Sequence, residues 1–371
     1  MMSLATIDPR LQQPSLRTDH HYWELRAFHH FTVATSATLP GSHAADVRDC
    51  FAVQAPILAL SHKPLWNEMV ALAALHLLST AASEGQLQKD AYQGLLACRE
   101  ASLAAALQTY RPILSELGPH NADAAGFTAI LLLVDAFATL GNRPLLMHEN
   151  DENAPSTYAP PIQWLRIARG ARTVLEEVLV LASAPVQENV NGPTTENPMS
   201  ILTIITSYPT AQFVPTEAAA ASTSHFGTKN PFSHLMLAIP GEATQPPEIL
   251  HAYIGAVEQL HRIQAAIDGP APDTTTGKTQ QQPALLLCRG MLSFPCLVPP
   301  LFLDLVEWQE PRALVLLAHF FALMIHVGAL WCVGDTPARE VRAIYRALPP
   351  RYHGLMRIPL ELVGRPCNGG G

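Results

Sequence analysis

The sequence has few charged residues. Only 15% of its 371 residues are Asp, Glu, Lys or Arg, whereas 48% are hydrophobic, so a large part of the chain should be buried. Basic residues are outnumbered, with 23 Lys and Arg against 31 Asp and Glu, and the formal net charge is −8. A protein that binds nucleic acid directly needs a basic surface to neutralise phosphates. We therefore expect no direct nucleic-acid binding by this chain.

Closely paired cysteines are also lacking. The six cysteines include no CxxC pair and no short spacing of the kind that binds zinc. Such cysteines are typical of reduced, buried thiols in an intracellular protein. We therefore predict that the chain has no metal ligands and no cofactor. The first 23 residues contain neither an apolar signal region nor an arginine-rich amphipathic stretch. We expect the protein in the nucleus, the cytoplasm or both.

The common local motifs of enzymes are missing as well. No GxSxG, HExxH or GxGxxG pattern occurs. The stretch PDTTTGKT (272–279) matches a phosphate-binding loop except that Pro272 replaces the first glycine, and proline has no N–H to donate to phosphate. We interpret it as a linker. Because catalytic groups assembled from distant residues leave no local motif, an enzyme stays an alternative.

Helical periodicity dominates what is present, and alternating β patterns are nearly absent. Pro112 should end or kink the second long helix. Asn121 should cap the third helix, with Gly141 just after its last turn, and Pro161 begins the fourth. These patterns predict helices over residues 64–83, 88–110, 121–140, 161–183, 248–267, 312–334 and 337–348.

The stretch 312–334, RALVLLAHFFALMIHVGALWCVG, has no charged side chain between its arginine and an aspartate at 335. It is long enough to span a membrane. His319 and His326 lie seven residues apart, on nearly the same helical face, and polar groups are costly at bilayer depth. Neither flank carries a basic cluster. We therefore predict a central core helix and no membrane span.

These helices predict an all-α fold consisting of one multi-helix bundle domain over residues 22–363. Two stretches rich in Pro, Thr, Ser and Gln interrupt it, at about 184–231 and 268–283, and are expected to be linkers or disordered insertions. Residues 1–21 and 364–371 are expected to be flexible ends.

Three arginines follow one another at every third position of the helix that begins at Pro161. Arg166, Arg169 and Arg172 could hold an anion, or they could pair with acidic neighbours beside a buried Trp164. We favour the ion-paired stripe, and the anion site stays open. Histidines on apolar helix faces are more often core residues bonded to carbonyls than ligands.

Several stretches, in this order, resemble the C-terminal regulatory domain of fungal zinc-cluster transcription factors, particularly the branch of sterol-uptake regulators. The resemblance covers about residues 22–183 and 248–363. It rests on ELRAFHHFTVATSATL, LWNEMVALAALHLLS, AYQGLLACREASLAAAL, NADAAGFTAILLLVDAFA, PIQWLRIARGARTVL, LSFPCLVPPLFLDLVEW and LPPRYHGLMRIPLELV.

The resemblance implies an all-α bundle whose apolar interior can hold a hydrophobic effector, with 312–334 as a central strut. Members of the family carry a basic six-cysteine zinc cluster ahead of this domain, and this sequence contains none. Either such a segment precedes these residues, or the protein works without touching DNA. The residues that we expect at the effector site are Phe127, Trp164, Arg166, Arg169, His319, Phe320, His326 and Trp331.

We therefore expect a regulator that senses a sterol-like or terpenoid-like molecule, or binds other transcription regulators, and controls lipid or secondary-metabolite genes. A homodimer is an open alternative. We expect that the protein is not an enzyme. The alternative hypothesis is a repurposed, cofactor-free cyclase or isomerase that acts on an apolar metabolite in the same pocket. A third hypothesis, a scaffold without ligand, predicts a filled core and no large pocket.

Overall fold

The regular elements of the protein are helices. The computed structural model describes residues 20–85, 88–146, 158–183, 230–240, 245–268 and 281–364, and within these ranges it contains no strand. The predicted all-α class is confirmed. The α-helices are α1 (His20–Val33), α2 (Ala45–Asp49), α3 (Ala55–Ala59), α4 (Lys63–Ser83), α5 (Lys89–Ser115), α6 (Ala122–Gly141), α7 (Arg143–Leu146), α8 (Ile162–Ser183), α11 (Pro247–Asp268), α12 (Gln281–Leu292), α13 (Phe294–Leu297), α14 (Pro300–Glu307), α15 (Pro311–Leu323), α16 (Thr336–Ala347) and α17 (Arg357–Gly364). Short 3-10 helices, and a π-helix at η4, also occur: η3 (Thr35–Thr38), η4 (Cys50–Gln54), η5 (Ser233–Met236), η7 (Met324–Val327) and η8 (Pro350–Met356).

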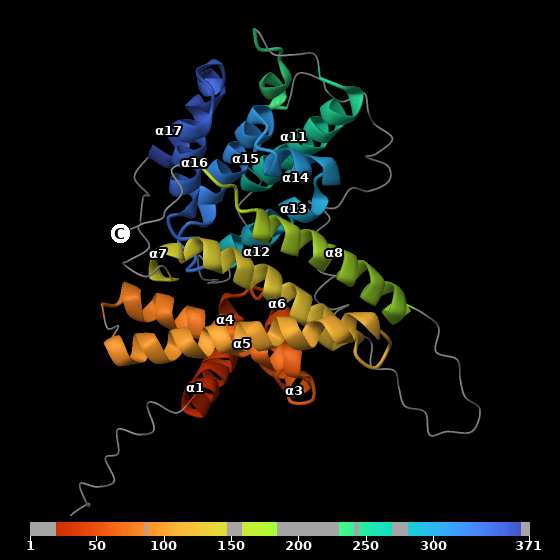
Figure 1. Cartoon of the computed structure of the whole chain (residues 1–371), viewed down its shortest axis with the longest axis vertical. Coiled ribbons are helices and arrows are strands. Elements are labelled where there is room, and N and C mark those ends of the chain that lie inside the picture. The colour runs from red at the N-terminus through yellow and green to blue at the C-terminus, as the bar shows by residue number, and fades with distance from the viewer. Residues whose placement is uncertain are drawn as a thin grey trace, which may run out of the picture.

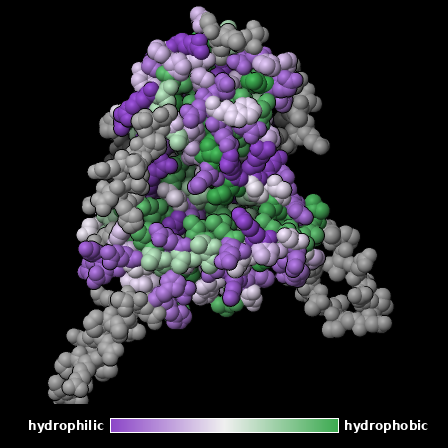
Figure 2. All heavy atoms as spheres, viewed as in Figure 1, coloured by the Kyte–Doolittle hydropathy of each residue, from purple (hydrophilic) through white to green (hydrophobic). Residues whose placement is uncertain are grey.

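The helices form two groups that share one core. Helices α1 and α3 to α6 lie in the lower half of Figure 1, α11 and α13 to α17 lie in the upper half, and α8 crosses between them. Helix α4 packs against α1, α5 and α6, while α15 packs against α11, α16 and α17. Buried residues of both groups belong to one continuous hydrophobic cluster. On the surface, hydrophobic patches gather along the middle of the face in Figure 2. The assignment of residues 22–363 to one domain stays a prediction.

The stretch 312–334 lies in the core, but it is not one helix. Every residue from Arg312 to Leu323 is buried. The α-helix ends at Leu323. The chain then continues through the 3-10 helix η7 and reaches Gly334, which has a left-handed conformation with φ 52°. The predicted 23-residue helix was therefore too long. Its C-terminal half consists of turns that glycine permits.

Helix α6 has the length and apolar composition of a membrane span, but 72% of its apolar window is buried inside the protein, as in the core helix of a soluble protein. Helices α14 and α15 together with η7 would also be long enough, but the two parts meet at 106°.

Three details of the predicted helices were wrong. Helix α5 continues through Pro112 to Ser115, so the proline neither ends nor interrupts it. Asn121 precedes α6 without capping it, since its side-chain oxygen accepts a hydrogen bond from the N–H of Gly118 at 2.9 Å. Gly141 is the last residue of α6 itself and not the residue after it.

Gly141 is required for a different reason. A Cβ at this position would lie 2.3 Å from the carbonyl oxygen of Cys332. The end of α6 therefore touches the backbone of the loop before α16, and a side chain here would separate the two. This contact joins the two groups of helices.

The predicted insertions lie mostly outside the described residues. Within the described part, α12 begins at Gln281, so the last three positions of the predicted insertion 268–283 are helical. Helix α1 likewise begins at His20, inside the stretch expected to be a flexible end.

Candidate effector pocket

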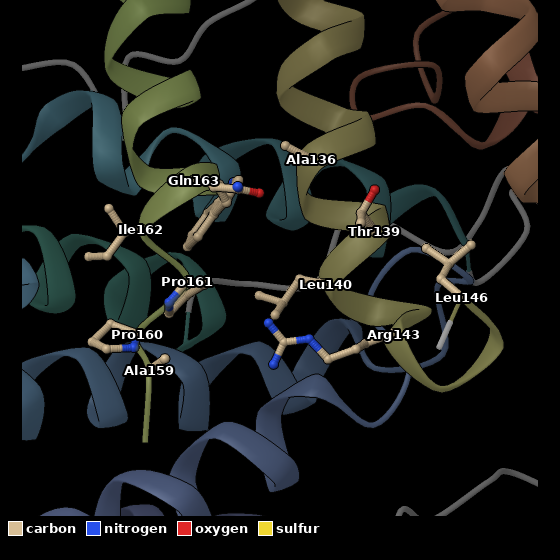
Figure 3. Close-up of a pocket in the computed structure, with 11 residues that line it drawn as sticks. Ala136, Thr139, Leu140, Arg143, Leu146, Ala159, Pro160, Pro161, Ile162 and Gln163 are labelled. Atoms are coloured by element: carbon tan, nitrogen blue, oxygen red, sulfur yellow. The ribbon is translucent and has the colours of Figure 1, made fainter. Parts of the chain in front are cut away.

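A pocket of about 370 Å³ lies where α6 ends and α8 begins. The last turns of α6 and the short helix α7 form one wall, and the segment that enters α8 forms the other (Figure 3). It is partly open to solvent. The lining residues are Ala136, Thr139, Leu140, Arg143, Leu146, Ala159, Pro160, Pro161, Ile162, Gln163 and Trp164.

The local sequence explains the shape of the pocket. Pro160 and Pro161 hold the chain extended before α8, because a proline disfavours helical conformation in the residue that precedes it. On the other wall, the guanidinium of Arg339 donates to the carbonyl of Leu140 at 2.6 Å and holds the end of α6. Together with the contact at Gly141, this bond fixes the wall to α16.

The polar groups of the pocket are few and are mainly donors. The guanidinium of Arg143 points across the pocket toward Pro160 and Pro161 (Figure 3). Trp164 is only 2% exposed, and its Nε1–H has no hydrogen-bond partner among the described residues. The amide of Gln163 is exposed at the edge. An apolar wall with a few placed polar groups is typical of small-molecule sites.

Thr139 connects the pocket to a buried charge cluster between α4, α5 and α6. Its hydroxyl accepts a hydrogen bond from Arg99 at 2.7 Å, and Arg99 also binds both carboxylate oxygens of Asp135, at 2.5 and 2.9 Å. Glu68 is fully buried beside this pair, and neither of its oxygens has a hydrogen-bond partner among the described residues. Burial, followed by the charge of Asp135, raises the pKa of Glu68 well above 4.5. Its surroundings therefore favour the neutral form of the carboxyl.

A second acidic group lies behind the pocket. The hydroxyl of Tyr158, the residue before the lining segment, donates to Glu340 on α16 at 3.1 Å. Burial raises the pKa of Glu340, although the charges of Arg339 and Arg143 act in the opposite direction. The pKa of Tyr158 is also raised, by burial and then by the charge of Glu340.

The eight predicted site residues do not surround one cavity. Trp164 lines the pocket, and Phe320 packs behind it with the two rings stacked at 5.9 Å between centroids. Phe320 also stacks on Phe294 at 4.2 Å and is fully buried, so it is a core residue. Phe127 lies elsewhere in the core, edge-on to Phe51.

The arginines of α8 form the ion-paired stripe. Arg166 binds Glu307 and Arg169 lies 3.5 Å from Asp304, both on α14. Arg172 pairs with Glu176 on its own helix. With their charges matched by carboxylates, Arg166 and Arg169 line only a small recess of about 50 Å³.

Replacing Arg166 with alanine is expected to change the melting temperature by less than about 3 °C, because exposed ion pairs contribute ~0–1 kcal/mol. A double-mutant cycle with Glu307→Ala, followed by thermal denaturation, measures the coupling directly. A coupling energy well above ~1 kcal/mol would mean that the pair holds α8 to α14 more strongly than its exposure indicates.

The remaining predicted residues have structural contacts. The Nε2 of His319 is 3.0 Å from the carbonyl oxygen of Leu355, and burial lowers the pKa of His319 to about 4. His326 is exposed on η7. Trp331 stacks on His76 at 4.5 Å and donates to Thr38 at 2.9 Å.

Arg143, Leu140 and Thr139 were not among the predicted site residues. Thr139 and Leu140 end the predicted helix that begins at Asn121, and Arg143 follows it, so the only local signal was the Pro160–Pro161 pair, which we used to place a helix start. Within the described residues, no three His, Cys, Asp or Glu side chains come together as a metal site would require.

A second hollow, of about 250 Å³, lies between the end of α1 and the stretch formed by α2 and η4. Alanines and Val33 line it together with Arg48 and Asp49. Beside it, Val53, Ile57 and Leu60 expose 46–71% of their surface. Large exposed apolar side chains so close in the chain are typical of protein contact surfaces.

No protein-family model matches the chain. It is 30% identical over 313 residues to the Zn(2)-C6 fungal-type transcription factor afumD of Aspergillus fumigatus, a match that covers 84% of this chain and 70% of that protein. It is 24% identical over 361 residues to a Zn(2)-C6 fungal-type transcription factor of Gibberella zeae, covering 92% of this chain and 62% of the relative. The chain thus spans about two thirds of the length of these relatives.

Proposed function

Because the chain belongs to the family of Zn(2)-C6 fungal-type transcription factors, we propose that it regulates transcription by sensing a small hydrophobic molecule in the pocket between α6, α7 and α8. The observation that carries this proposal is the pocket itself. Its 370 Å³ lies at the lower end of the roughly 300–1,000 Å³ of ligand sites, and most of its lining is apolar. This size suits a terpenoid or another small lipid better than a sterol. The genes it controls would be those of lipid or secondary metabolism.

Contacts of the pocket walls could transmit ligand binding to the packing of the helices. Leu140 and Gly141 contact the region of α16 through Arg339 and Cys332, and Thr139 contacts the buried pair of Arg99 and Asp135. A ligand that prefers one arrangement of these contacts shifts the population toward it. Binding would then change how the two groups of helices pack, which is what a partner protein can detect.

One surface of the regulator would meet other proteins. The apolar residues beside the second hollow support contact with other regulators. With a net charge of −8 we expect no direct binding of these residues to nucleic acid. A nuclear location follows from the family.

The residues of this pocket support catalysis of a reaction less well than they support binding of a ligand by a regulator. Among the eleven described lining residues, none carries a carboxyl, imidazole, thiol, phenol or amine that could move a proton at neutral pH. Glu340 and Tyr158 are occupied with each other behind the wall. A cyclase or isomerase would need such a group in contact with its substrate.

The test is binding of hydrophobic probes to the purified chain. Farnesol is expected to bind and to raise the melting temperature, measured by calorimetry and thermal shift. Ala136→Trp, which fills the pocket, should weaken binding by ~10-fold or more, a loss of about 1.4 kcal/mol or more. The matched control is Ala104→Trp at an exposed position of α5, which should bind normally.

Equal binding by wild type and Ala136→Trp would place the probe elsewhere, and an absence of any thermal shift with farnesol would contradict sensing at this pocket. Conversion of a probe into a product during the titration would favour the enzyme.

A further inference from the structure

We propose that the molecule bound in this pocket is amphipathic, with an apolar body and an anionic head group that Arg143 holds. The inference rests on the proposed function of the pocket and specifies its ligand. The head group would be a carboxylate or a phosphate monoester, which present the same kind of charged oxygens to a guanidinium.

The first argument is that Arg143 has no ion-pair partner within the described part of the chain. Arg99, Arg166, Arg169 and Arg339 all bind carboxylates. Arg143, in contrast, makes no hydrogen bond or ion pair with any residue that the structure describes. Its planar group carries five N–H donors in a fork that matches two oxygens of an anion.

The second argument is its position. The guanidinium projects across the pocket toward Pro160 and Pro161, and Leu140 and Leu146 lie on its own wall (Figure 3). Proline offers no N–H that would compete for an anion. Arg143 is exposed, so its guanidinium stands at the open side of the pocket with apolar side chains beside it. A ligand could therefore place its head group at the solvent edge and its apolar body against these walls.

The third argument is that Glu340, the described carboxyl with which Arg143 interacts, already has other partners. Glu340 is the carboxyl whose ionisation Arg143 favours, but Tyr158 donates to it and Arg339 lies 3.6 Å away. Burial raises the pKa of Glu340, which opposes the charged form of this carboxyl. The pocket therefore keeps a positive charge that a ligand can match.

The fourth argument is that the other unused groups are also donors. The Nε1–H of Trp164 is buried and has no hydrogen-bond partner among the described residues. The same wall contains the N-terminus of the 22-residue helix α8, where backbone N–H groups and the helix dipole favour a negative charge. The described residues that line the pocket thus supply several donors, and none of them carries a carboxylate.

The test compares probes that share one apolar body. Decanoic acid, decyl phosphate and decan-1-ol differ only in the head group, and their affinities for the full chain are measured by calorimetry at neutral pH. At least one of the two anions is expected to bind ~10-fold or more tightly than the alcohol, and the stronger of them identifies the source of the head group. Arg143→Gln should remove this preference while the affinity for decan-1-ol changes less than ~2-fold. Arg143→Lys, which keeps the charge without the fork, should retain part of it.

The matched control is Arg111→Gln, at an exposed position of α5 away from the pocket, which should leave all three affinities unchanged. Equal affinity of the wild type for the alcohol and both anions, or a preference that survives in Arg143→Gln, would overturn the anionic head group. If Ala136→Trp still abolished binding of the probes in that case, the result would support the pocket as the binding site and contradict only the anionic head group. Failure of all three probes to bind would contradict the pocket itself.

Discussion

Replacing Asp135 with alanine is expected to lower the free energy of unfolding by about 3–5 kcal/mol. The change would leave the guanidinium of Arg99 buried without its carboxylate, and a buried unpaired charge is far more costly than a lost surface pair. Arg99 would keep only the carbonyl of Ala71 and the hydroxyl of Thr139 as partners, both neutral. Urea denaturation followed by circular dichroism measures the loss.

The matched control is Glu68→Gln, which keeps the shape of a second buried carboxyl in the same cluster. The pKa of Glu68 is raised on folding. The free energy of unfolding therefore decreases as the pH rises above 4.5, and it continues to decrease until the pH passes the pKa of Glu68 in the folded protein. Glu68→Gln should therefore be no less stable than wild type at neutral pH, with an advantage that shrinks toward pH 4.5. A large destabilisation by Glu68→Gln, or a small one by Asp135→Ala, would mean that the ionised partner of Arg99 is Glu68.

Replacing Gly141 with alanine is expected to cost about 1–3 kcal/mol or more, because the added methyl would lie 2.3 Å from a backbone oxygen that cannot rotate away. The end of α6 would have to move from the loop before α16. Gly170→Ala is the control, since Gly170 lies inside α8 and a Cβ there meets nothing within 4 Å.

Alanine is the better helix former by about 0.8–1.0 kcal/mol, so Gly170→Ala should raise the melting temperature while Gly141→Ala lowers it. The same measurement on both variants gives opposite signs. A stabilising effect of Gly141→Ala would show that the contact with Cys332 is not close in solution.

Much of the fold could be predicted because helical periodicity is a local property. The helices over 64–83, 161–183 and 248–267 begin and end within one residue of their predicted bounds. The errors arose where a distant contact decides the local structure. Gly141 has the position and composition of a helix stop, but it is a glycine because Cys332 approaches from the other half of the chain.

The candidate site was harder to predict. Most of the predicted site residues were aromatic residues and histidines on apolar helix faces. In the structure most of these side chains pack against other side chains, as Phe320 and Trp331 do. Trp164 was the one member that reaches the pocket. Arg143 could not be distinguished from the arginines of α8 by sequence, because what separates them is the carboxylates on α14, more than 130 residues away.

Arg143 is exposed and forms no ion pair within the described part of the chain, and this has a consequence for how such regulators evolve. A side chain in such a position can be exchanged at little cost to folding, whereas Gly141, two residues earlier, is held against the backbone of Cys332. Descendants of one ancestral regulator could thus acquire responses to acidic, neutral or basic metabolites by single substitutions at this position, each on an intact scaffold.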